Sequence, residues 1–514
     1  MVNSRCGMKL APCPGMNANR HRLIVVSNRL PFVFQRESRG AWRVDAGSGG
    51  LVSALLPVLR HRGGTWIGWP GTSDACAGLD PILTRTSAQA GFALHAVHLT
   101  AEEVLDFYHG YSNEVIWPLF HDLQPLCNFD PKYWRGYCGV NRRFAQVIMR
   151  NSNQEDFVWV HDYHLMNIAQ DLRRLGCGSR TGFFLHIPFP PPDLFLKLPW
   201  CRNLIEALLE YELVGFQTLR DRRNFVECVK AVLENSQIAG RGQIVTAVAG
   251  AKRVRIGVFP IGIDFNDFLR QTATPQVAAK AKELHTLLPD RRLVLGVDRL
   301  DYTKGIPHRL NAFENLLTRY PDLKEKISLI QVVVPSRVGI PDYNDLKTSI
   351  EQTVGRINGA FVRPGGWVPV WYVYGSLTRT ELLAYYRAAD IALVTPLKDG
   401  MNLVAKEYCA CSMEEDCVLI LSEFAGAAAQ LHSGALLVNP YDIEGVADAI
   451  VHAYEMDAAE RSGRMRRLRR SIRKYDVFWW VDSFLSAAFA TELSAFPLPA
   501  GSVAELAMDY LGPD

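Results

Sequence analysis

The sequence predicts an α/β protein with two domains, each built on a parallel β-sheet. Its 514 residues are more than one ordinary hydrophobic core holds, which favours two domains. Short apolar segments alternate with helical patterns along the chain, as in parallel sheets covered by helices. Several segments are apolar without interruption, which is typical of strands buried on both faces. The predicted strands are residues 23–26, 157–160, 182–185, 213–216, 293–297, 327–334, 371–374, 391–394, 418–421 and 435–438.

The segment Val258–Asp264 marks the expected junction between the domains. It has the pattern of a strand that runs into a turn and then into a helix start, and it lies midway along the chain. We therefore place one domain at residues 22–265 and the other at residues 266–475. Residues 1–21 have no apolar core of signal-peptide length, and we expect them to form a flexible extension.

Composition argues against several classes of protein. The formal net charge of +3 is small, so the chain as a whole gives no sign of binding nucleic acid. No apolar run is long enough to span a bilayer. The 11 cysteines are scattered, odd in number and without a C-x-x-C pair. This argues against a zinc site or a disulfide framework and favours a reduced, cytoplasmic compartment.

A basic segment near the C-terminus stands out from this charge balance. Residues 461–474 contain eight Arg and Lys side chains. However, Met465, Leu468 and Ile472 form an apolar stripe at helical spacing. We therefore interpret the segment as a solvated basic helix and not as a nucleic-acid interface.

Reactive side chains repeatedly follow the predicted strands. In open α/β sheets the ligand crevice lies outside the carboxyl ends of the strands. Because such residues come from both halves of the chain, we expect the ligand to lie between the two domains. These strand-end residues are Arg29, His161, Asp162, His186, Arg299, Arg337 and Asp399.

The segment 389–407 carries the strongest functional signal. A predicted strand breaks at Thr395-Pro396, crosses a polar turn and restarts as a helix from Asn402. Such a unit directs backbone N–H groups into the crevice at the carboxyl edge of the sheet. Gly400 lets a ligand approach the backbone, and Glu407 is placed to bind a sugar hydroxyl. An ordinary strand–loop–helix connection is the alternative interpretation.

Arg299 and Lys304 lie five residues apart around another strand end. Two cations at the mouth of a crevice suit a diphosphate, because Arg binds bidentately and Lys acts as a point charge. The alternative is an ion pair of Arg299 with Asp298 or Asp301 inside the loop.

The glycine-rich turn at residues 47–51 precedes a predicted helix at 52–59, and a helix N-terminus favours anions. Tyr108 and Trp117 are consistent with a pocket wall, but also with the core. These first-half signals are weak when each is taken alone.

Two further polar residues of the first half follow predicted strands. His186 lies in a proline-rich strand exit, which fixes its position. Asp162 lies between His161 and His164 in a pattern that is poor for zinc. Binding of a sugar hydroxyl is the simpler role for Asp162.

The longer motifs, taken together and in order, closely resemble the trehalose-6-phosphate synthase family from about residue 22 to about residue 490. The motifs that carry the resemblance are Ser27-Asn28-Arg29, Gly49-Gly50-Leu51, His161-Asp162-Tyr163-His164-Leu165, residues 184–190, residues 297–305 and residues 399–407. Lys398 stands where many members of that family have Arg, and the conserved charge predicts little effect.

The resemblance implies a GT-B fold, in which two Rossmann-like domains face each other across a cleft. It implies transfer of glucose from a nucleotide sugar, with UDP-glucose expected, to glucose 6-phosphate in trehalose biosynthesis, with retention at the anomeric carbon. The first domain would bind the acceptor and the second the nucleotide sugar, and a terminal helix in residues 476–514 would return to the first domain. No metal or other cofactor is implied, and a homo-oligomer is a family expectation. The choice among UDP-, GDP- and ADP-glucose stays open.

The resemblance also implies roles for individual residues. Arg299 and Lys304 would hold the donor diphosphate and stabilise the charge on the leaving group. The implied donor-binding residues are Gly50, Arg299, Lys304, Asp399, Gly400, Met401, Asn402, Leu403 and Glu407. The implied acceptor-binding residues are Arg29, Tyr108, Trp117, Asp162 and Arg337. The implied catalytic residues are His186, Asp162, Arg299 and Lys304.

Two alternatives remain beside this function. One is a related synthase with another phosphorylated acceptor, such as a glycerol phosphate or a cyclitol phosphate. The other is a non-catalytic sensor of sugar phosphates. The presence of all the implied donor and acceptor residues favours the active synthase.

Overall fold

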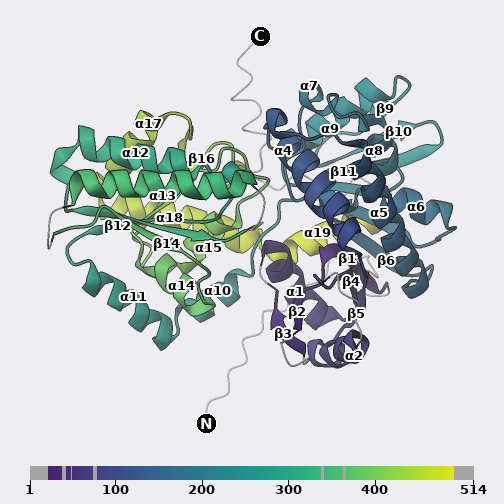
Figure 1. Ribbon diagram of the computed structural model, residues 1–514, viewed down its shortest axis with the longest axis horizontal. Helices are drawn as coiled ribbons and strands as arrows, with labels where there is room; N and C mark the ends of the chain where they lie inside the picture. The colour runs from purple at the N-terminus through teal and green to yellow at the C-terminus, as the bar shows by residue number, and fades with distance from the viewer. Residues whose placement is uncertain are drawn as a thin grey trace.

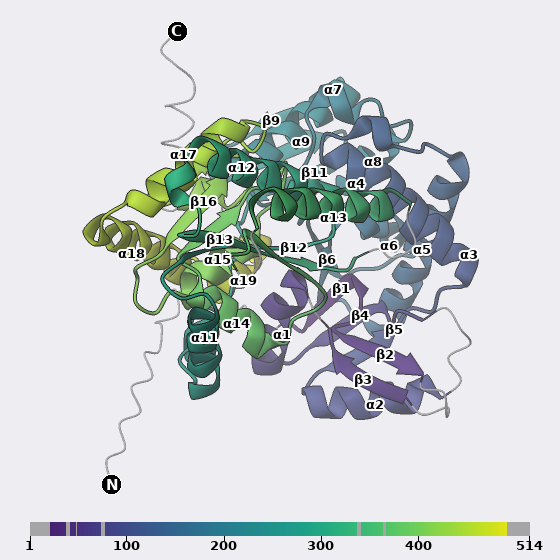
Figure 2. The same ribbon diagram turned by 60° about the vertical axis from the view of Figure 1, so that its left-hand side comes forward.

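The computed structural model describes residues 21–36, 42–47, 49–72, 78–336, 341–362 and 366–490. They form two α/β domains that lie side by side, one from the purple-to-teal first half of the chain and one from the part that runs from teal through green to yellow (Figure 1). Figure 2 shows the two domains from a direction turned by 60°. The fold class predicted from the sequence is confirmed.

The first domain contains a nine-stranded sheet that is parallel except at one edge. Neighbouring strands from β5 to β11 are parallel, and β10 and β9 run antiparallel beyond them. The order of its strands is β5 (Ala93–Ala96), β4 (Thr65–Trp69), β1 (Leu23–Arg29), β6 (Phe157–His161), β7 (Arg180–Phe184), β8 (Leu213–Phe216), β11 (Lys252–Val258), β10 (Ile244–Ala249) and β9 (Gln237–Ala239).

Both faces of this sheet are buried, which explains its uninterrupted apolar strands. Along β1, Leu23 and Val25 pack into one hydrophobic cluster, whereas Ile24 and Val26 pack into the cluster on the opposite face. The helices of the first domain are α1 (Gly50–Arg62), α2 (Leu79–Ala90), α3 (Ala101–Glu103), η2 (Val104–Ile116), α4 (Trp117–Phe120), η3 (Gln124–Leu126), α5 (Pro131–Asn151), η4 (Tyr163–Leu165), α6 (Ile168–Arg174), α7 (Pro192–Phe195), α8 (Cys201–Leu208) and α9 (Leu219–Val232).

The second domain contains a six-stranded sheet in which all neighbouring strands are parallel. Its strand order is β14 (Val370–Tyr374), β13 (Ile327–Val334), β12 (Arg292–Arg299), β15 (Ile391–Val394), β16 (Val418–Ser422) and β17 (Leu436–Val438). The helices after residue 264 are α10 (Phe265–Thr272), α11 (Pro275–Leu287), η5 (Tyr302–Lys304), α12 (Ile306–Arg319), η6 (Pro321–Leu323), α13 (Pro341–Phe361), α14 (Arg379–Ala388), α15 (Leu403–Cys411), α16 (Ala428–Leu431), α17 (Ile443–Glu455), α18 (Ala458–Lys474) and α19 (Val477–Phe489).

All ten predicted strands are present, with small differences at their ends. Strands β4, β5, β9, β10 and β11 were not among the predicted strands, nor was the antiparallel hairpin of β2 (Phe32–Arg36) and β3 (Trp42–Ala46). Of the unpredicted strands in this sheet, β5 and β9 are short and lie at its edges, whereas β4, β10 and β11 lie inside it. Local sequence gives little sign of such strands, because pairing with neighbours defines them.

The terminal helix α19 packs against the first sheet, although it follows the second domain in sequence. Its Phe484 covers the glycines of β7 and β8: a Cβ on Gly182 or Gly215 would come within 2.9 Å of that ring. Its Trp480 lies 4.9 Å from the ring of Trp159 on β6. The chain therefore passes between the domains twice.

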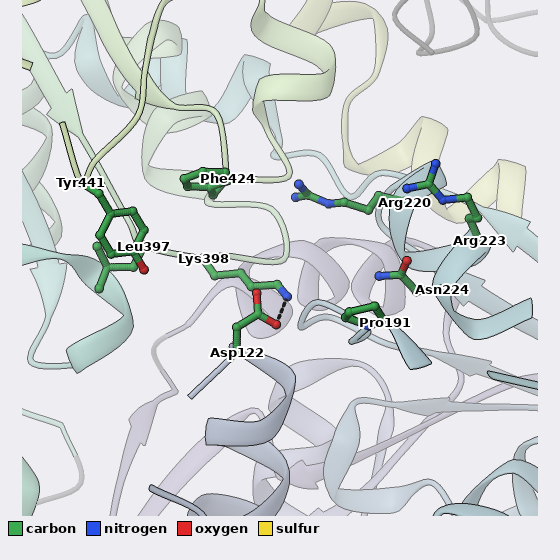
Figure 3. Close-up of a pocket in the computed structure, with 9 residues that line it drawn as sticks. All are labelled: Asp122, Pro191, Arg220, Arg223, Asn224, Leu397, Lys398, Phe424 and Tyr441. Atoms are coloured by element: carbon green, nitrogen blue, oxygen red, sulfur yellow. Dashed lines mark hydrogen bonds and ion pairs between the residues drawn. The ribbon is translucent and has the colours of Figure 1, made fainter. Parts of the chain in front are cut away.

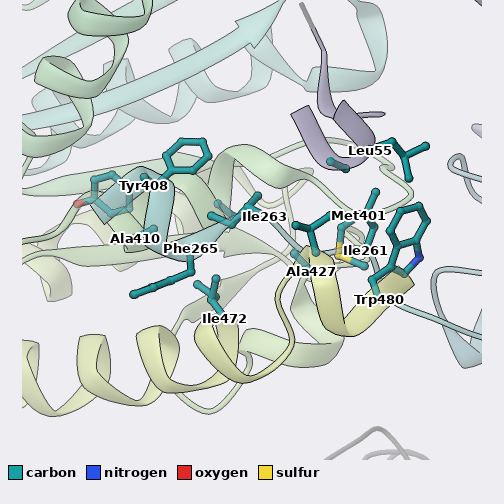
Figure 4. Close-up of a cluster of buried hydrophobic side chains, with 14 of the residues drawn as sticks. Leu55, Ile261, Ile263, Phe265, Met401, Tyr408, Ala410, Ala427, Ile472 and Trp480 are labelled. Carbon is teal, nitrogen blue, oxygen red and sulfur yellow. The ribbon is translucent and has the colours of Figure 1, made fainter. Parts of the chain in front are cut away.

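The two passages lie against each other where the domains join. Val477 N–H donates to the carbonyl of Ile263 at 3.1 Å, and a Cβ on Gly262 would overlap the backbone of Tyr475 and Asp476. Figure 4 shows Ile261 and Trp480 in one buried apolar cluster with Leu55 of α1 and Met401. Within the described ranges, no helix has the length and apolar character needed to cross a membrane.

Candidate functional site

The loop after β15 holds a buried ion pair at the carboxyl edge of the second sheet. Lys304 Nζ lies 2.5 Å from Asp399 Oδ2, and Asn402 Nδ2 donates to the same oxygen at 3.2 Å. Burial alone would raise the pKa of Asp399, but the charge and hydrogen bond of Lys304 outweigh it and lower that pKa. Asp399 is therefore an ionised carboxylate beside a cation.

A fully buried arginine forms hydrogen bonds to several segments near this edge of the sheet. Arg309 of α12 forms an ion pair with Asp298 at 2.5 Å, and it donates to Gln331 Oε1 and Thr395 Oγ1, each at 3.1 Å. These partners belong to β12, to β13 and to the loop after β15. The guanidinium also donates to the carbonyl of Lys304 at 3.4 Å, so it connects β12, β13 and the loop after β15 to the lysine of the ion pair.

Arg299 is the exposed cation of this region. In the described part of the chain it forms no ion pair with Asp298 or Asp301, because Asp298 pairs with Arg309 and Asp301 caps the short helix η5. The loop ion pair considered from the sequence is therefore absent there. Instead, Arg299 Cζ lies 6.0 Å from the ring centroid of Trp117 in the first domain.

The two domains make backbone contact at Gly400. A Cβ on this glycine would overlap the carbonyl oxygen of His186, which follows β7 of the first domain. On the other side of the loop, a Cβ on Gly426 would overlap the carbonyl oxygen of Gly400. Only glycine fits between these backbones, so the loop 399–402 lies directly against His186.

His186 forms a pair with the buried His161. His161 Nδ1 lies 3.2 Å from His186 Nε2. Burial lowers the pKa of His186 to about 3 and also lowers the pKa of His161, so both rings are neutral near pH 7. One hydrogen therefore bridges the two rings.

The unpartnered nitrogen of His161 decides which ring donates that hydrogen. His161 Nε2 is buried without a hydrogen-bond partner, and a hydrogen there would be a donor without an acceptor. The lower-energy arrangement puts the hydrogen on His161 Nδ1, which donates to His186 Nε2. His186 then carries its own hydrogen on Nδ1. That nitrogen is the one that can donate to a group outside the pair.

Asp162 has a backbone conformation that is uncommon outside glycine, with φ 75°. Its N–H donates to the carbonyl of Phe184 at 2.8 Å, and its Oδ1 accepts from the N–H of His186 at 3.3 Å. A left-handed conformation at a non-glycine residue costs on the order of 1–3 kcal/mol and is common at functional sites. The strain keeps this carboxylate at the strand ends beside His186.

Aromatic rings of the first domain surround Arg29 at the end of β1. Its Cζ lies 3.9 Å from the ring centroid of Trp69 and 5.7 Å from that of Tyr108. Tyr108 lies in the π-helix η2 and stacks on His164 with the ring centroids 5.9 Å apart. A π-helical turn is rare and often marks a functional site. The cation and these rings form one polar and aromatic wall.

Glu407 and Leu403 lie on α15, beyond the loop. Glu407 Oε2 accepts from the hydroxyl of Tyr386 at 2.9 Å, and burial raises the pKa of Glu407. A Cβ on Gly50, at the start of α1, would come within 2.7 Å of Leu403 Cδ1. The glycine-rich turn of the first domain therefore approaches the helix that follows the loop.

The structure thus brings most of the predicted residues to the facing strand ends of the two domains. Arg337 lies outside the described residues. The sequence interpretation missed Trp69, Arg309 and His121. His121 is buried, and its Nδ1 donates to the carbonyl of Trp117 at 2.7 Å. Trp69 ends an unpredicted strand, and that strand-end position was the signal available for it. Among the described residues, no group of three or more His, Cys, Asp or Glu could hold a metal ion.

Comparison with known proteins identifies a matching family model and related proteins. The sequence model of glycosyltransferase family 20 matches residues 21–489. The trehalose-6-phosphate synthase of Mycolicibacterium smegmatis is 41% identical over 473 residues, which cover 91% of this chain and 92% of the relative.

Two solved structures are also similar. The first is an alpha,alpha-trehalose-phosphate synthase (UDP-forming) from Burkholderia xenovorans in complex with glucose-6-phosphate, with a TM-score of 0.82, 34% identity, and coverage of 91% of this chain and 100% of that chain. The second is a structure from E. coli with bound UDP-2-fluoro glucose, with a TM-score of 0.80, 37% identity, and coverage of 91% of this chain and 98% of that chain.

Proposed function

The chain belongs to glycosyltransferase family 20, and we propose that it transfers glucose from UDP-glucose to glucose 6-phosphate to form trehalose 6-phosphate. The observation that carries the proposal is the meeting of the two domains at one site. There, Arg299 and the Lys304–Asp399 pair of the second domain lie opposite His186 and Trp117 of the first. Cations on one side and a histidine with an aromatic ring on the other suit a sugar diphosphate and a sugar acceptor.

We propose that the two domains bind different substrates. Residues 22–265 would bind the acceptor, residues 266–475 would bind the nucleotide sugar, and the segment 476–514 would return to the first domain. The packing of α19 against β6, β7 and β8 supports the last assignment. We place the reaction in the cytoplasm, where phosphorylated sugars and nucleotide sugars are found.

For the donor, we assign the diphosphate to Arg299 and Lys304. The Lys304 ammonium already binds the Asp399 carboxylate at 2.5 Å, so an arriving phosphate would share this cation. The donor glucose would contact residues 399–402, whose loop begins at that carboxylate. Glu407 would bind the ribose, with Leu403 and Gly50 beside the nucleotide.

For the acceptor, we assign the phosphate end to Arg29, Tyr108, Trp117 and Arg337, and the sugar hydroxyls to Asp162. The position of Arg29 against Trp69 and Tyr108 supports the first assignment, because stacking fixes the guanidinium plane for bidentate binding. The strained backbone of Asp162 supports the second.

The proposed chemistry retains the configuration at the donor carbon. The bond between the anomeric carbon and the leaving phosphate oxygen breaks, and a bond from that carbon to the acceptor hydroxyl oxygen forms on the same face. The hydroxyl proton passes to the departing phosphate. Arg299 and Lys304 stabilise the negative charge that develops on the phosphate, which lowers the barrier. His186, neutral and with its hydrogen on Nδ1, would orient the donor sugar.

The test is an assay of nucleotide release with glucose 6-phosphate and each of UDP-, GDP- and ADP-glucose, followed by identification of the sugar product. We expect trehalose 6-phosphate with UDP-glucose. The variant Arg299→Ala should lower kcat by a factor of roughly 10²–10³, as loss of one group that stabilises the developing charge does. The variant Arg319→Ala, which removes an arginine at the far end of α12, is the control and should keep full activity.

Two results would contradict the proposal. If glucose 6-phosphate stimulated no nucleotide release with any of the three donors, the result would favour another phosphorylated acceptor or a sensor. An unchanged rate in Arg299→Ala would remove the assignment of the leaving group.

A further inference from the structure

A cavity of about 360 Å³ lies between the two domains, beside the loop 399–402 and apart from the residues assigned above. Figure 3 shows its walls: Arg220 and Arg223 come from α9 of the first domain, whereas Lys398, Phe424 and Tyr441 come from loops after strands of the second. Its volume falls in the range of about 300–1,000 Å³ that is usual for small-molecule sites.

The lining of this cavity has an excess of positive charge. Arg220 and Arg223 are exposed, and within the described residues neither forms an ion pair or a side-chain hydrogen bond. Among the described lining residues, Asp122 is the one carboxylate. Its Oδ1 forms an ion pair with Lys398 Nζ at 2.5 Å. The neighbouring Asp221 accepts from the hydroxyl of Thr218 at 2.5 Å, and its carboxylate also attracts Arg220 and Lys398. The cavity therefore keeps an excess of positive charge, because Arg220, Arg223 and Lys398 face only the carboxylates of Asp122 and Asp221 among the described residues.

The arginines also stand at an unfavourable end of their helix. Both lie in the first two turns of α9, which begins at Leu219. The helix dipole makes this end positive, so it stabilises anions and disfavours cations. Figure 3 shows Arg220 extending from α9 toward Lys398 and Phe424. An anion in the cavity would relieve the repulsion between the helix end, the two arginines and the lysine.

The aromatic wall indicates that the anion has an organic part. The ring centroids of Phe424 and Tyr441 are 6.3 Å apart, and Tyr441 is more than half exposed. Two guanidinium groups suit a phosphate monoester, which they can bind bidentately. We propose that this cavity is a second ligand site, and that it binds a small phosphorylated metabolite between α9 and the loop that carries Lys398.

The proposed site has a direct connection to the loop of the first site. Lys398 immediately precedes Asp399, so a ligand that binds Lys398 competes with Asp122 and holds the loop from outside the reaction cleft. Since the walls come from both domains, occupancy would also stabilise the arrangement in which they meet.

The test is calorimetric titration of the full chain with glycerol 3-phosphate and, separately, with inorganic phosphate. Each titration is run on the free protein and on protein saturated with UDP and glucose 6-phosphate, so that phosphate binding at the reaction site is recognised. We expect saturable binding of glycerol 3-phosphate under both conditions. The double variant Arg220→Gln/Arg223→Gln should weaken it by at least roughly tenfold, since two charge-assisted hydrogen bonds are lost.

The control is the double variant Arg466→Gln/Arg470→Gln on α18, which removes the same charge from exposed positions far along the chain. It should change the affinity by less than about twofold, the size of effect expected from surface charge at a distance. An equal loss in both double variants would reduce the binding to general electrostatics and overturn the site. Absence of binding to protein saturated with UDP and glucose 6-phosphate would overturn it as well. Equal affinities for inorganic phosphate and glycerol 3-phosphate would overturn the organic part of the proposal.

Discussion

At the scale of single residues, the backbone contact at Gly400 limits what the site tolerates. A Cβ at this position would overlap the carbonyl oxygen of His186, and neither backbone is free to move as a side chain would. We expect Gly400→Ala to lower kcat/KM by a factor of roughly 10², because a displacement of about 1 Å in a catalytic geometry has that effect. Steady-state kinetics measure this.

The matched control for that substitution is Gly355→Ala in α13, where an added Cβ meets no atom within 4 Å. It should leave activity unchanged and stabilise the protein by about 0.5–1 kcal/mol, the usual preference of a helix for alanine over glycine. If both variants were equally active, the contact at Gly400 would have no role in catalysis.

The hydrogen bond between His161 and His186 gives a second prediction at this scale. His161→Leu removes the donor to His186 Nε2 and leaves the ring of His186 free to carry its hydrogen on either nitrogen. We expect kcat/KM for the donor to fall by a factor of about 10, the equivalent of one lost hydrogen bond. His161→Gln keeps a donor and should recover part of the loss.

Nitrogen-15 chemical shifts of the histidine rings provide a readout that packing alone would not change. In the wild-type protein His186 should be the Nδ1–H tautomer, and in His161→Leu it should be a mixture. A wild-type His186 with its hydrogen on Nε2 would reverse the assignment of donor and acceptor in the pair.

At the scale of elements, Arg309 connects helix α12 to β12, to β13 and to the loop after β15. Replacing it with Met would leave Asp298 as a buried carboxylate without its cation. We expect Arg309→Met to lower the free energy of unfolding by about 3–5 kcal/mol, as breaking a buried ion pair does. Urea unfolding followed by fluorescence measures the change. Arg319→Met, at the exposed end of the same helix, should lower it by less than about 1 kcal/mol.

The same elements show which features a single sequence can predict. The strand ends were found because β12, β13 and β15 are mostly apolar and charged residues stand at or soon after their ends: Arg299 ends β12, and Arg337 and Asp399 follow β13 and β15 in the sequence. Arg309 was not found, because an arginine on an amphipathic helix looks like a surface residue until its partners on other strands are known. Trp69 was missed together with β4, although the Thr, Trp and Ile residues of that strand are typical of strands. The contacts that give these residues their roles join distant parts of the chain, and a local sequence pattern does not show such contacts.

At the scale of the whole molecule, a buried lysine links the second domain to the segment between the domains. Lys406 of α15 donates to the carbonyl of Ile261 and to Gln430 Oε1, both at 2.6 Å. Burial lowers the pKa of Lys406 from 10.5 to about 7. A neutral amine has two hydrogens, and these match the two acceptors.

This lysine predicts how stability changes with pH. Between pH 7 and pH 10.5 the folded state binds fewer protons at Lys406 than the unfolded state, so the stability of the folded state rises with pH over this interval. Below pH 7 the cost of burying the charge is present in full. We expect the difference in Tm between the wild type and Lys406→Met to shift in favour of the wild type from pH 7 to pH 9. Calorimetry at several pH values would measure it, and a difference that does not vary with pH would rule out the titration.

The path of the chain through both domains has a consequence for the order of events on the ribosome. The first sheet is translated early, but Phe484 and Trp480, which cover the apolar faces of β6, β7 and β8, are among the last residues of the described chain. A nascent chain therefore exposes Trp159 and Phe184 throughout the synthesis of the whole second domain. Nascent chains that stop before α19 should be targets for chaperones, and the completed N-terminal half can mature only when its final helix arrives.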